Sequence, residues 1–135
     1  MIEKNVVSCF LEYKGKILIA RRSSKVGTYQ GRWAGISGYL EKDSYRTALN
    51  ELQEEVNLTA EDVKLIKEGE VLQVPDEKLN ILWNVHPFLF RCKSPEKIKL
   101  DWEHKEYRWV DPREISKYET VPKLKEAFER VKVNK

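Results

Sequence analysis

The sequence predicts an α+β fold, a mixed α/β/α sandwich in which a mixed β-sheet lies between helices. Strand-like segments outnumber helical ones, and one long helical segment separates the second strand-like segment from the third. A regular alternation of strands and helices would instead indicate a doubly wound parallel sheet. The strand-like segments, rich in β-branched and aromatic residues, are 6–13, 16–22, 63–74, 78–93 and 104–110.

The connections between these strands carry their own predictions. Lys14 and Gly15 separate the first two strands, which predicts a hairpin. A long glycine-rich connection follows over 23–43, and its segment "RWAGISGYL" can supply a short strand. "PDEK" is a turn before the strand 78–93. Pro87 predicts a bulge or an edge position in that strand, because proline cannot donate to a sheet ladder.

One long helix is predicted from Asp43 or Ser44, either of which can cap it, to about Leu58. Asn57 suits its end, because asparagine tolerates the left-handed conformation. The apolar residues at helical spacing are Ala48, Leu49, Leu52 and Val56. A proline-started helical turn is predicted at 112–117. A last helix is predicted in "VPKLKEAFERVKV", with an apolar face of Leu124, Ala127, Phe128 and Val131.

Length and composition describe one globular domain over 1–135. A hydrophobic share of 41% with 35% charged residues excludes disorder. No segment has the apolar length of a membrane span, and the first residues lack a signal pattern, so a cytoplasmic protein without a membrane partner is expected. The net charge is +3, with basic and acidic residues interspersed, so nucleic acid is not an expected partner, whereas a small anionic ligand is.

The cysteines and histidines do not predict a zinc site. Cys9 and Cys92 lie in apolar strand-like segments, which indicates buried reduced thiols. Neither His86 nor His104 has a second histidine or a cysteine at metal-ligand spacing.

The stretch "NELQEEVNL" over 50–58 crowds three carboxylates together. Glu51, Glu54 and Glu55 stand at i, i+3 and i+4, so they share one face of the predicted helix, largely away from its apolar face. A solvated acidic face is the alternative, yet Glu51 has Glu55 rather than a lysine at i+4, which costs about 0.2–0.5 kcal/mol. All three also lie in the second half of the helix, where its dipole disfavours anions. We therefore expect a cation, Mg²⁺ or Mn²⁺, that shares its shell with water and a substrate phosphate.

The strand 16–22 ends in Arg21 and Arg22, next to the glycine-rich connection. Arginine suits phosphate oxygens, and glycine lets a ligand approach the backbone closely. An ordinary charged strand end is the alternative interpretation.

The segment 38–58, "GYLEKDSYRTALNELQEEVNL", resembles the Nudix box, G-x5-E-x7-R-E-U-x-E-E-x-G-U, where U is a bulky aliphatic residue. The matching residues are Gly38, Glu51, Leu52, Glu54, Glu55 and Leu58. "KILIARR" resembles the family's strand before the substrate loop, and "WEHKEYRWVDPREI" resembles its late acidic segment and aromatic strand. The resemblance covers nearly the whole chain and predicts a Nudix-like fold.

The chain departs from this box in its first half. The span from Gly38 to Asn50 is two residues shorter than the pattern. Asn50 stands in the arginine position and Asn57 in the late glycine position. The first glutamate of the box has Asp43 and Glu41 as candidates, with Lys42 or Ser44 under other gap placements. In the family the arginine is paired with a carboxylate that orients the metal site, so either both partners are lost together or the site has decayed.

The resemblance implies a pyrophosphohydrolase that cleaves a nucleoside triphosphate or another nucleoside diphosphate derivative, with water and a divalent metal. It implies Glu51, Glu54 and Glu55 as metal ligands, one of them also serving as a base. A further carboxylate comes from the late segment, and Glu103 is favoured over Glu106.

The predicted substrate-binding residues lie in and beside the glycine-rich connection. They are Arg21, Arg22, Tyr29, Trp33 and Gly38, with Tyr39 as a further stacking candidate. Packing in the core or on the sheet is the expected role of Trp83, Trp102 and Trp109.

Asn50 and the shortened loop motivate an alternative, a nucleotide-binding or regulatory module with little or no catalysis. An RNA-end processing enzyme fits the mild charge poorly, and isomerase chemistry has no cysteine near the box to favour it. A homodimer is left open by the sequence.

Overall fold

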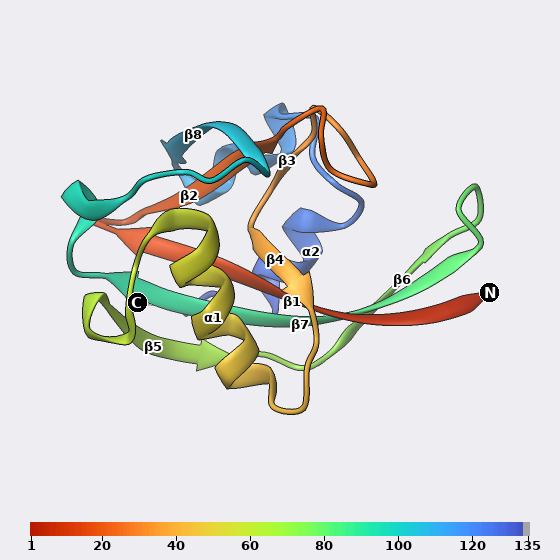
Figure 1. Ribbon diagram of the computed structural model, residues 1–135, viewed down its shortest axis with the longest axis horizontal. Helices are drawn as coiled ribbons and strands as arrows, with labels where there is room; N and C mark the ends of the chain where they lie inside the picture. The colour runs from red at the N-terminus through yellow and green to blue at the C-terminus, as the bar shows by residue number, and fades with distance from the viewer. Residues whose placement is uncertain (134–135) are drawn as a thin grey trace.

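An eight-stranded mixed β-sheet forms the centre of the computed structural model, which describes residues 1–133 (Figure 1). The predicted domain, 1–135, extends two residues beyond this part of the chain. The strands are β1 Ile2–Tyr13, β2 Lys16–Arg22, β3 Trp33–Ala34, β4 Ile36–Tyr39, β5 Val63–Glu68, β6 Leu72–Asp76, β7 Ile81–Cys92 and β8 His104–Val110. The helices are α1 Ser44–Val56 and α2 Leu124–Glu129, with short 3-10 helices η1 Ala60–Asp62, η2 Pro95–Lys97 and η3 Pro112–Lys117.

Strand β1 is the point at which the sheet forks. On one side it pairs in parallel with β7 along its whole length, from Ile2 opposite Ile81 to Glu12 opposite Arg91. On the other side its middle pairs with β4, and only its last residues pair with β2, in the predicted hairpin. Strand β2 then runs away from β1 and pairs with β8 and β3. The two branches, β4 on one and β2 with β3 on the other, both contribute to the cavity described below.

The two faces of the sheet each carry a hydrophobic core, because neighbouring side chains on a strand point to opposite faces. Helix α1 covers one face, where Cys9, Leu18 and Phe88 pack with its buried residues. Helix α2 and η3 cover the other, where Phe10, Ile17 and Leu89 pack. Figure 1 shows α1 in front of the sheet and α2 behind it. The predicted α+β class, a mixed sheet between helices, is confirmed.

The segment predicted as one strand over 63–74 is two strands, β5 and β6, separated by an interruption that begins at Gly69. A Cβ at this position would lie 2.6 Å from the Arg130 carbonyl oxygen and 2.9 Å from a Val131 methyl, so glycine permits the close approach of the C-terminal segment. Strand β6 also continues through Asp76, which leaves 77–80 as the turn.

Pro87 lies in the middle of the sheet, so of the two predicted alternatives the edge position is wrong, and the register irregularity beside it lies on β5, between Leu65 and Lys67. Strand β7 has β1 on one side and both β5 and β6 on the other. Pro87 falls between the part paired with β6 and the part paired with β5, where its carbonyl accepts from the Gly69 N–H at 3.0 Å. A residue's N–H and C=O point to the same side of a strand, so the missing donor of Pro87 faces the interruption between the two strands.

Helix α1 follows its predicted bounds closely. Asp43 caps it by accepting from the Tyr45 N–H at 3.3 Å, and Asn57 ends it in the left-handed conformation. The buried Thr47 hydroxyl accepts from the Glu41 N–H at 3.1 Å and lies 2.8 Å from the Glu41 carbonyl oxygen. These contacts tie the loop before the helix to its first turn.

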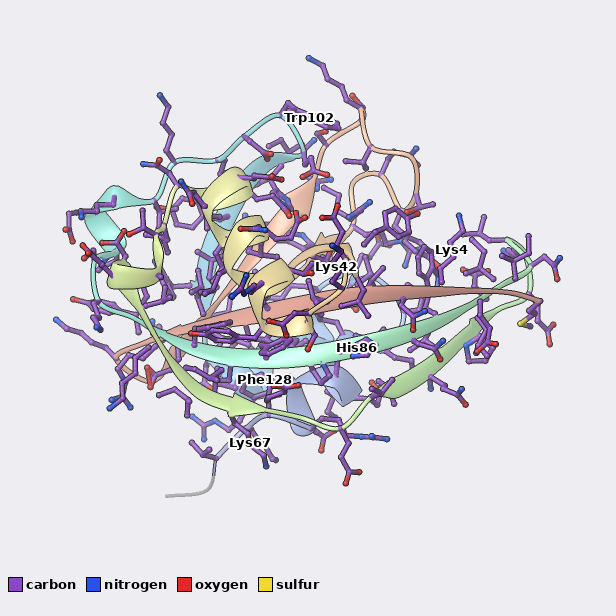
Figure 2. The ribbon with its side chains drawn as sticks, turned by 60° about the horizontal axis from the view of Figure 1, so that its bottom comes forward. Lys4, Lys42, Lys67, His86, Trp102 and Phe128 are labelled. Atoms are coloured by element: carbon purple, nitrogen blue, oxygen red, sulfur yellow. The ribbon has the colours of Figure 1, made fainter. Side chains whose placement is uncertain are left out.

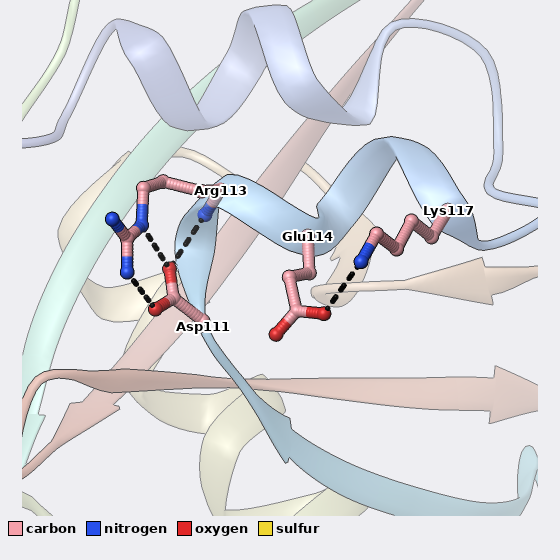
Figure 3. A network of polar contacts seen from close by, with 4 residues as sticks. All are labelled: Asp111, Arg113, Glu114 and Lys117. Carbon is pink, nitrogen blue, oxygen red and sulfur yellow. Dashed lines mark hydrogen bonds and ion pairs between the residues drawn. The ribbon is translucent and has the colours of Figure 1, made fainter.

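The C-terminal part contains the predicted helical turn, η3, and the predicted last helix, α2, which is shorter than the predicted segment. Asp111 accepts from the Arg113 backbone N–H at 2.9 Å and from its guanidinium at 2.8 Å, and Lys117 pairs with Glu114 along η3 (Figure 3). The expected apolar face of Leu124, Ala127, Phe128 and Val131 is buried.

The expected thiols Cys9 and Cys92 are both buried and free. None of the helices in the described residues has the length and apolarity needed to cross a membrane.

Candidate functional site

Helix α1 presents the predicted glutamates at different depths. Glu55 is 1% exposed, Glu51 is half-buried, and Glu54 is exposed. The difference follows from helical geometry, because Glu55 neighbours the buried Leu52 at i−3, whereas Glu54 lies further round the helix toward solvent.

A tight turn over 101–104 brings a third carboxylate to this helix. The Asp101 N–H donates to the Glu55 carbonyl oxygen at 3.1 Å, and the Glu103 N–H donates to the Asp101 side chain at 3.0 Å. The turn thereby places Glu103 beside α1. One carboxylate oxygen from each of Glu51, Glu55 and Glu103 lies within 4.8 Å of the others.

Of the two late glutamates considered, Glu103 therefore joins the cluster. Glu106 points elsewhere and pairs with Arg21 at 3.3 Å and with Arg108 at 3.8 Å. Glu54, predicted as a ligand, lies outside the cluster of three, although its charge contributes to the raised pKa of Glu51.

Burial raises the pKa of Glu51 to about 9, and the neighbouring Glu55 carboxylate acts in the same direction. Burial likewise raises the pKa of Glu55 to about 8, although the neighbouring Glu51 side chain opposes this, and burial and the Asp101 charge raise the pKa of Glu103. Without a cation Glu51 and Glu55 hold protons near neutral pH, because like charges crowded in a partly dry site cannot all ionise.

The cluster fits an oxygen-coordinated divalent cation. All three donors are carboxylates, the ligands that Mg²⁺ and Mn²⁺ prefer. Glu55 Oε2 is buried and has no hydrogen-bond partner among the described residues. A buried carboxylate oxygen without a partner is costly, and a cation would satisfy it.

His104 is a neighbour of this cluster that the sequence did not single out as functional. Its Nε2 lies 2.7 Å from Glu55 Oε1, and both side chains are buried. Burial lowers the pKa of His104, with opposing contributions from Asp101 and Glu103. Sequence spacing for metal-ligating histidines could not find it, because it contacts a carboxylate from a distant element.

Gly38 lies directly under the side chain of Glu51. A Cβ built on Gly38 would lie 2.7 Å from Glu51 Cγ and still closer to its carboxyl group. The absence of a side chain in β4 thus allows Glu51 to lie against the strand on its way to the cluster.

The two predicted arginines have different surroundings. Arg22 lines a cavity of about 180 Å³ next to the cluster, together with Glu103. Its Nε donates to the Thr28 carbonyl oxygen at 3.0 Å, and burial lowers its pKa. Arg21 donates from Nε to the Gly31 carbonyl oxygen at 3.0 Å and pairs with Glu106, so it stabilises the loop and does not line the cavity.

The cavity wall is largely aromatic and apolar. Tyr39 and Trp83 lie 6.3 Å apart between ring centres, tilted by 33°, and Tyr29 lies 6.4 Å from Trp83 between ring centres. The Trp83 indole donates to the Tyr29 hydroxyl at 3.0 Å, and that hydroxyl donates to Asp76 at 2.5 Å. Tyr29, Tyr39 and Gly38 thus line the cavity as the sequence suggested, and Trp83 joins them from β7.

Two other tryptophans differ from expectation. Trp33, predicted to bind substrate, is buried in the core with Tyr118, 5.4 Å between ring centres, and does not line the cavity. Trp102, predicted to pack, is 59% exposed, and Figure 2 shows it at the periphery of the molecule. Periodicity could not distinguish them, because Trp33 lies in a two-residue strand and Trp102 at the tip of a turn.

The model of the NUDIX domain family matches residues 2–131. The chain belongs to this family. The match confirms the resemblance derived from the box and, with it, the expected enzyme class, a Nudix-type pyrophosphohydrolase acting on acid anhydrides.

Solved structures of this family share the fold. An Ap4A hydrolase of C. elegans is 17% identical, covers 96% of this chain and 94% of its own, and has a TM-score of 0.75. The dihydroneopterin triphosphate pyrophosphohydrolase of E. coli is 17% identical, with 96% of each chain covered and a TM-score of 0.75. A MutT protein of Methanosarcina mazei Go1 is 25% identical over 96% of this chain and 92% of its own, at a TM-score of 0.73. None of the curated proteins matches the chain.

Proposed function

We propose that this Nudix protein, as a single domain over 1–135, is a metal-dependent hydrolase of a pyrophosphate bond. Its substrate is a nucleoside triphosphate or another nucleoside diphosphate derivative, and its cation is Mg²⁺ or Mn²⁺. The observation that carries the proposal is the convergence of Glu51, Glu55 and Glu103 beside a cavity with an arginine and aromatic walls. Structural relatives whose names specify a diadenosine tetraphosphate and a pterin triphosphate as substrates support this class.

The residues divide the work between two neighbouring regions. Glu51, Glu55 and Glu103 would hold the cation, which when bound supplies polarisation of the pyrophosphate and a lower pKa for the attacking water. Arg22 would bind phosphate oxygens, since it lines the cavity together with Glu103. Tyr39 and Trp83 hold the nucleobase or another flat leaving portion.

Glu54 would act in a step of the reaction that takes place at the solvent-accessible side of the site. It is exposed, and it stands one residue before the buried ligand Glu55. An exposed carboxylate here can ligate the substrate-bound cation or take the proton of the attacking water, as the box resemblance suggests. Arg21 acts indirectly through the loop that it stabilises, and Trp33 through the core.

A nucleotide panel assayed with Mg²⁺ and with Mn²⁺ tests the proposal. The wild-type protein should release phosphate or pyrophosphate from a member of the panel. Glu55→Gln and Glu54→Gln should each abolish turnover, and only Glu55→Gln should also weaken Mn²⁺ binding in the absence of nucleotide. The matched control is Glu70→Gln, an exposed carboxylate between β5 and β6. Equal background rates for wild type and both variants across the panel contradict the proposal.

A nucleotide-binding module with little or no catalysis is the second candidate. Asn50 is exposed and stands where the box has arginine, and the loop before α1 is short. Calorimetry that shows saturable nucleotide binding by a protein without turnover would favour this module over the hydrolase.

A further inference from the structure

We propose that His104 is a positioning residue that fixes the orientation of the Glu55 carboxylate, so that one oxygen is held by the protein and the other is presented to the cation. This inference rests on the proposed metal site and adds a residue to it from outside the Nudix box. Its chemical content is a hydrogen bond from the His104 ring to a metal-binding carboxylate.

The geometry of the pair assigns the two oxygens different tasks. His104 Nε2 lies 2.7 Å from Glu55 Oε1, and the two side chains are 1% and 2% exposed. An ionised carboxylate can only accept, so in the cation-bound site the ring must carry its proton on Nε2. Oε1 is thus occupied by the protein. Oε2 is buried without a partner among the described residues and is the oxygen left for a cation.

The backbone around His104 ties Glu55 to a second carboxylate of the cluster. The Asp101 N–H donates to the Glu55 carbonyl oxygen at 3.1 Å, and the His104 N–H donates to the Asp101 carbonyl oxygen at 3.4 Å. The same turn carries Glu103, whose N–H is held by the Asp101 side chain. This one short turn therefore contacts Glu55 at both its backbone and its carboxylate, and it also carries Glu103. The distance between the two proposed ligands Glu55 and Glu103 thus depends on the turn.

Outer hydrogen bonds of this kind orient metal ligands, and their loss costs 10–100-fold in metal affinity or activity as a rule of thumb, on the order of 1–3 kcal/mol. A purely space-filling role for a buried imidazole predicts something different. It predicts that any side chain of similar volume and polarity serves equally well.

The two amide substitutions of His104 separate these roles. In His104→Gln the amide nitrogen reaches the place of the imidazole Nε2, whereas in His104→Asn the shorter side chain places its nitrogen near Nδ1 and leaves Glu55 Oε1 without a donor. Mn²⁺ binding followed by electron paramagnetic resonance, at one pH and without nucleotide, should give a dissociation constant close to wild type for His104→Gln. For His104→Asn it should be raised by about 10–100-fold.

His86 provides the matched control, since it is the other of the two histidines in the chain and lies on β7. Figure 2 shows it well away from the loop that carries Trp102 and Glu103. His86→Gln and His86→Asn should both bind Mn²⁺ as the wild type does. Equal affinities for His104→Gln and His104→Asn, whether both native or both weakened, overturn the positioning role.

A measurement on the wild-type protein does not depend on how the variants fold. In a ¹⁵N-histidine spectrum, saturation with Mg²⁺ should shift the ring nitrogens of His104, with Nε2 protonated in the bound state, and leave those of His86 unchanged. Unchanged His104 signals, or an unprotonated Nε2 with Mg²⁺ bound, overturn the inference. Turnover is scored separately: intact Mn²⁺ binding without hydrolysis of any nucleotide overturns the proposed function and leaves the His104 role standing.

Discussion

Replacing Gly38 by alanine should weaken metal binding while leaving the fold intact, because the three atoms nearest to the new methyl group all belong to the flexible side chain of Glu51. The Cβ would lie 2.7 Å from Glu51 Cγ. An ordinary carbon–carbon contact is about 3.5–4.0 Å and the carboxyl group lies closer than Cγ, so this side chain has to move by at least about 1 Å. The far end of a glutamate can rotate at little cost, yet this end is a proposed ligand.

The magnitude follows from these two facts. The backbone of Gly38 is not in the left-handed region, so alanine is accepted there and even reduces the entropy of the unfolded chain, a gain of about 0.4–1 kcal/mol. A ligand misplaced by about 1 Å loses on the order of 100-fold in activity. We therefore expect Gly38→Ala to have a melting temperature within a few degrees of wild type and to bind Mn²⁺ about 10–100-fold more weakly.

The matched control is Gly27→Ala in the same glycine-rich connection. A Cβ on Gly27 meets nothing within 4 Å, and its backbone is also outside the left-handed region. It should resemble Gly38→Ala in thermal melting and the wild type in Mn²⁺ affinity and turnover. Native Mn²⁺ affinity in Gly38→Ala would show either that Glu51 is not a ligand or that it reaches the cation from another direction.

Three further outcomes are expected from other parts of the molecule. In the cation-free protein, Glu51 and Glu55 have pKa values raised from the ordinary 4.5 to about 9 and about 8, so the folded state holds protons that the unfolded chain has released. The free energy of unfolding in EDTA should therefore fall between about pH 5 and pH 9, by about 1 kcal/mol per pH unit after allowance for the exposure of Glu51, and the stabilisation by Mg²⁺ should grow over the same range; a flat thermal-melting profile in EDTA contradicts this. Trp83→Leu should raise KM for nucleotide about tenfold with kcat and Mn²⁺ affinity retained, since aromatic stacking on a base is worth about 1–3 kcal/mol, and an unchanged KM in steady-state kinetics contradicts a base-binding role. Thr47→Val should lower the free energy of unfolding by about 1 kcal/mol in urea titrations, because the Glu41 N–H, in the loop before α1, loses its acceptor. Thr59→Val, on the connection after the helix, is the comparison, because it removes a hydroxyl that donates to Asp62 and accepts from no backbone N–H of the loop before α1.

The local elements were predictable because their signals are local. Helix α1 is specified by its cap at Asp43, its apolar spacing and the left-handed Asn57, and these decide its bounds within two residues of the prediction. The hairpin at Gly15 follows from turn chemistry in the same way, whereas the one short strand predicted in "RWAGISGYL" is two strands, β3 and β4. Pro87 shows the limit, since its interpretation depends on which strands flank β7, and strand order is a property of the whole chain.

The candidate site was predictable where it lies on one helix and not where it is assembled from distant elements. Glu51 and Glu55 share a face by spacing alone, whereas a third carboxylate from the late segment was expected from the family resemblance, with Glu103 favoured for its place in "WEH". Trp83 could not be assigned to the cavity, because only the fork of the sheet at β1 places β7 beside the loop that carries Tyr29.

The departures at Asn50 and in the shortened loop therefore bear less on the catalytic capacity of the site than the box alone suggests. In the family pattern an arginine is paired with a carboxylate that orients the metal site; here Asn50 stands in the arginine position, and the first glutamate has only Asp43 and Glu41 as candidates. Asn50 is exposed and lies on the side of α1 away from the core, while the loop is tied to the helix by the buried Thr47. Glu55 is instead oriented at the C-terminal end of α1, by its contacts with the turn that carries Glu103 and His104. The buried contact of His104 with Glu55, and the second Glu55 oxygen without a partner among the described residues, therefore support a site that still binds a cation, and the Mn²⁺ affinities of His104→Asn and Gly38→Ala test it.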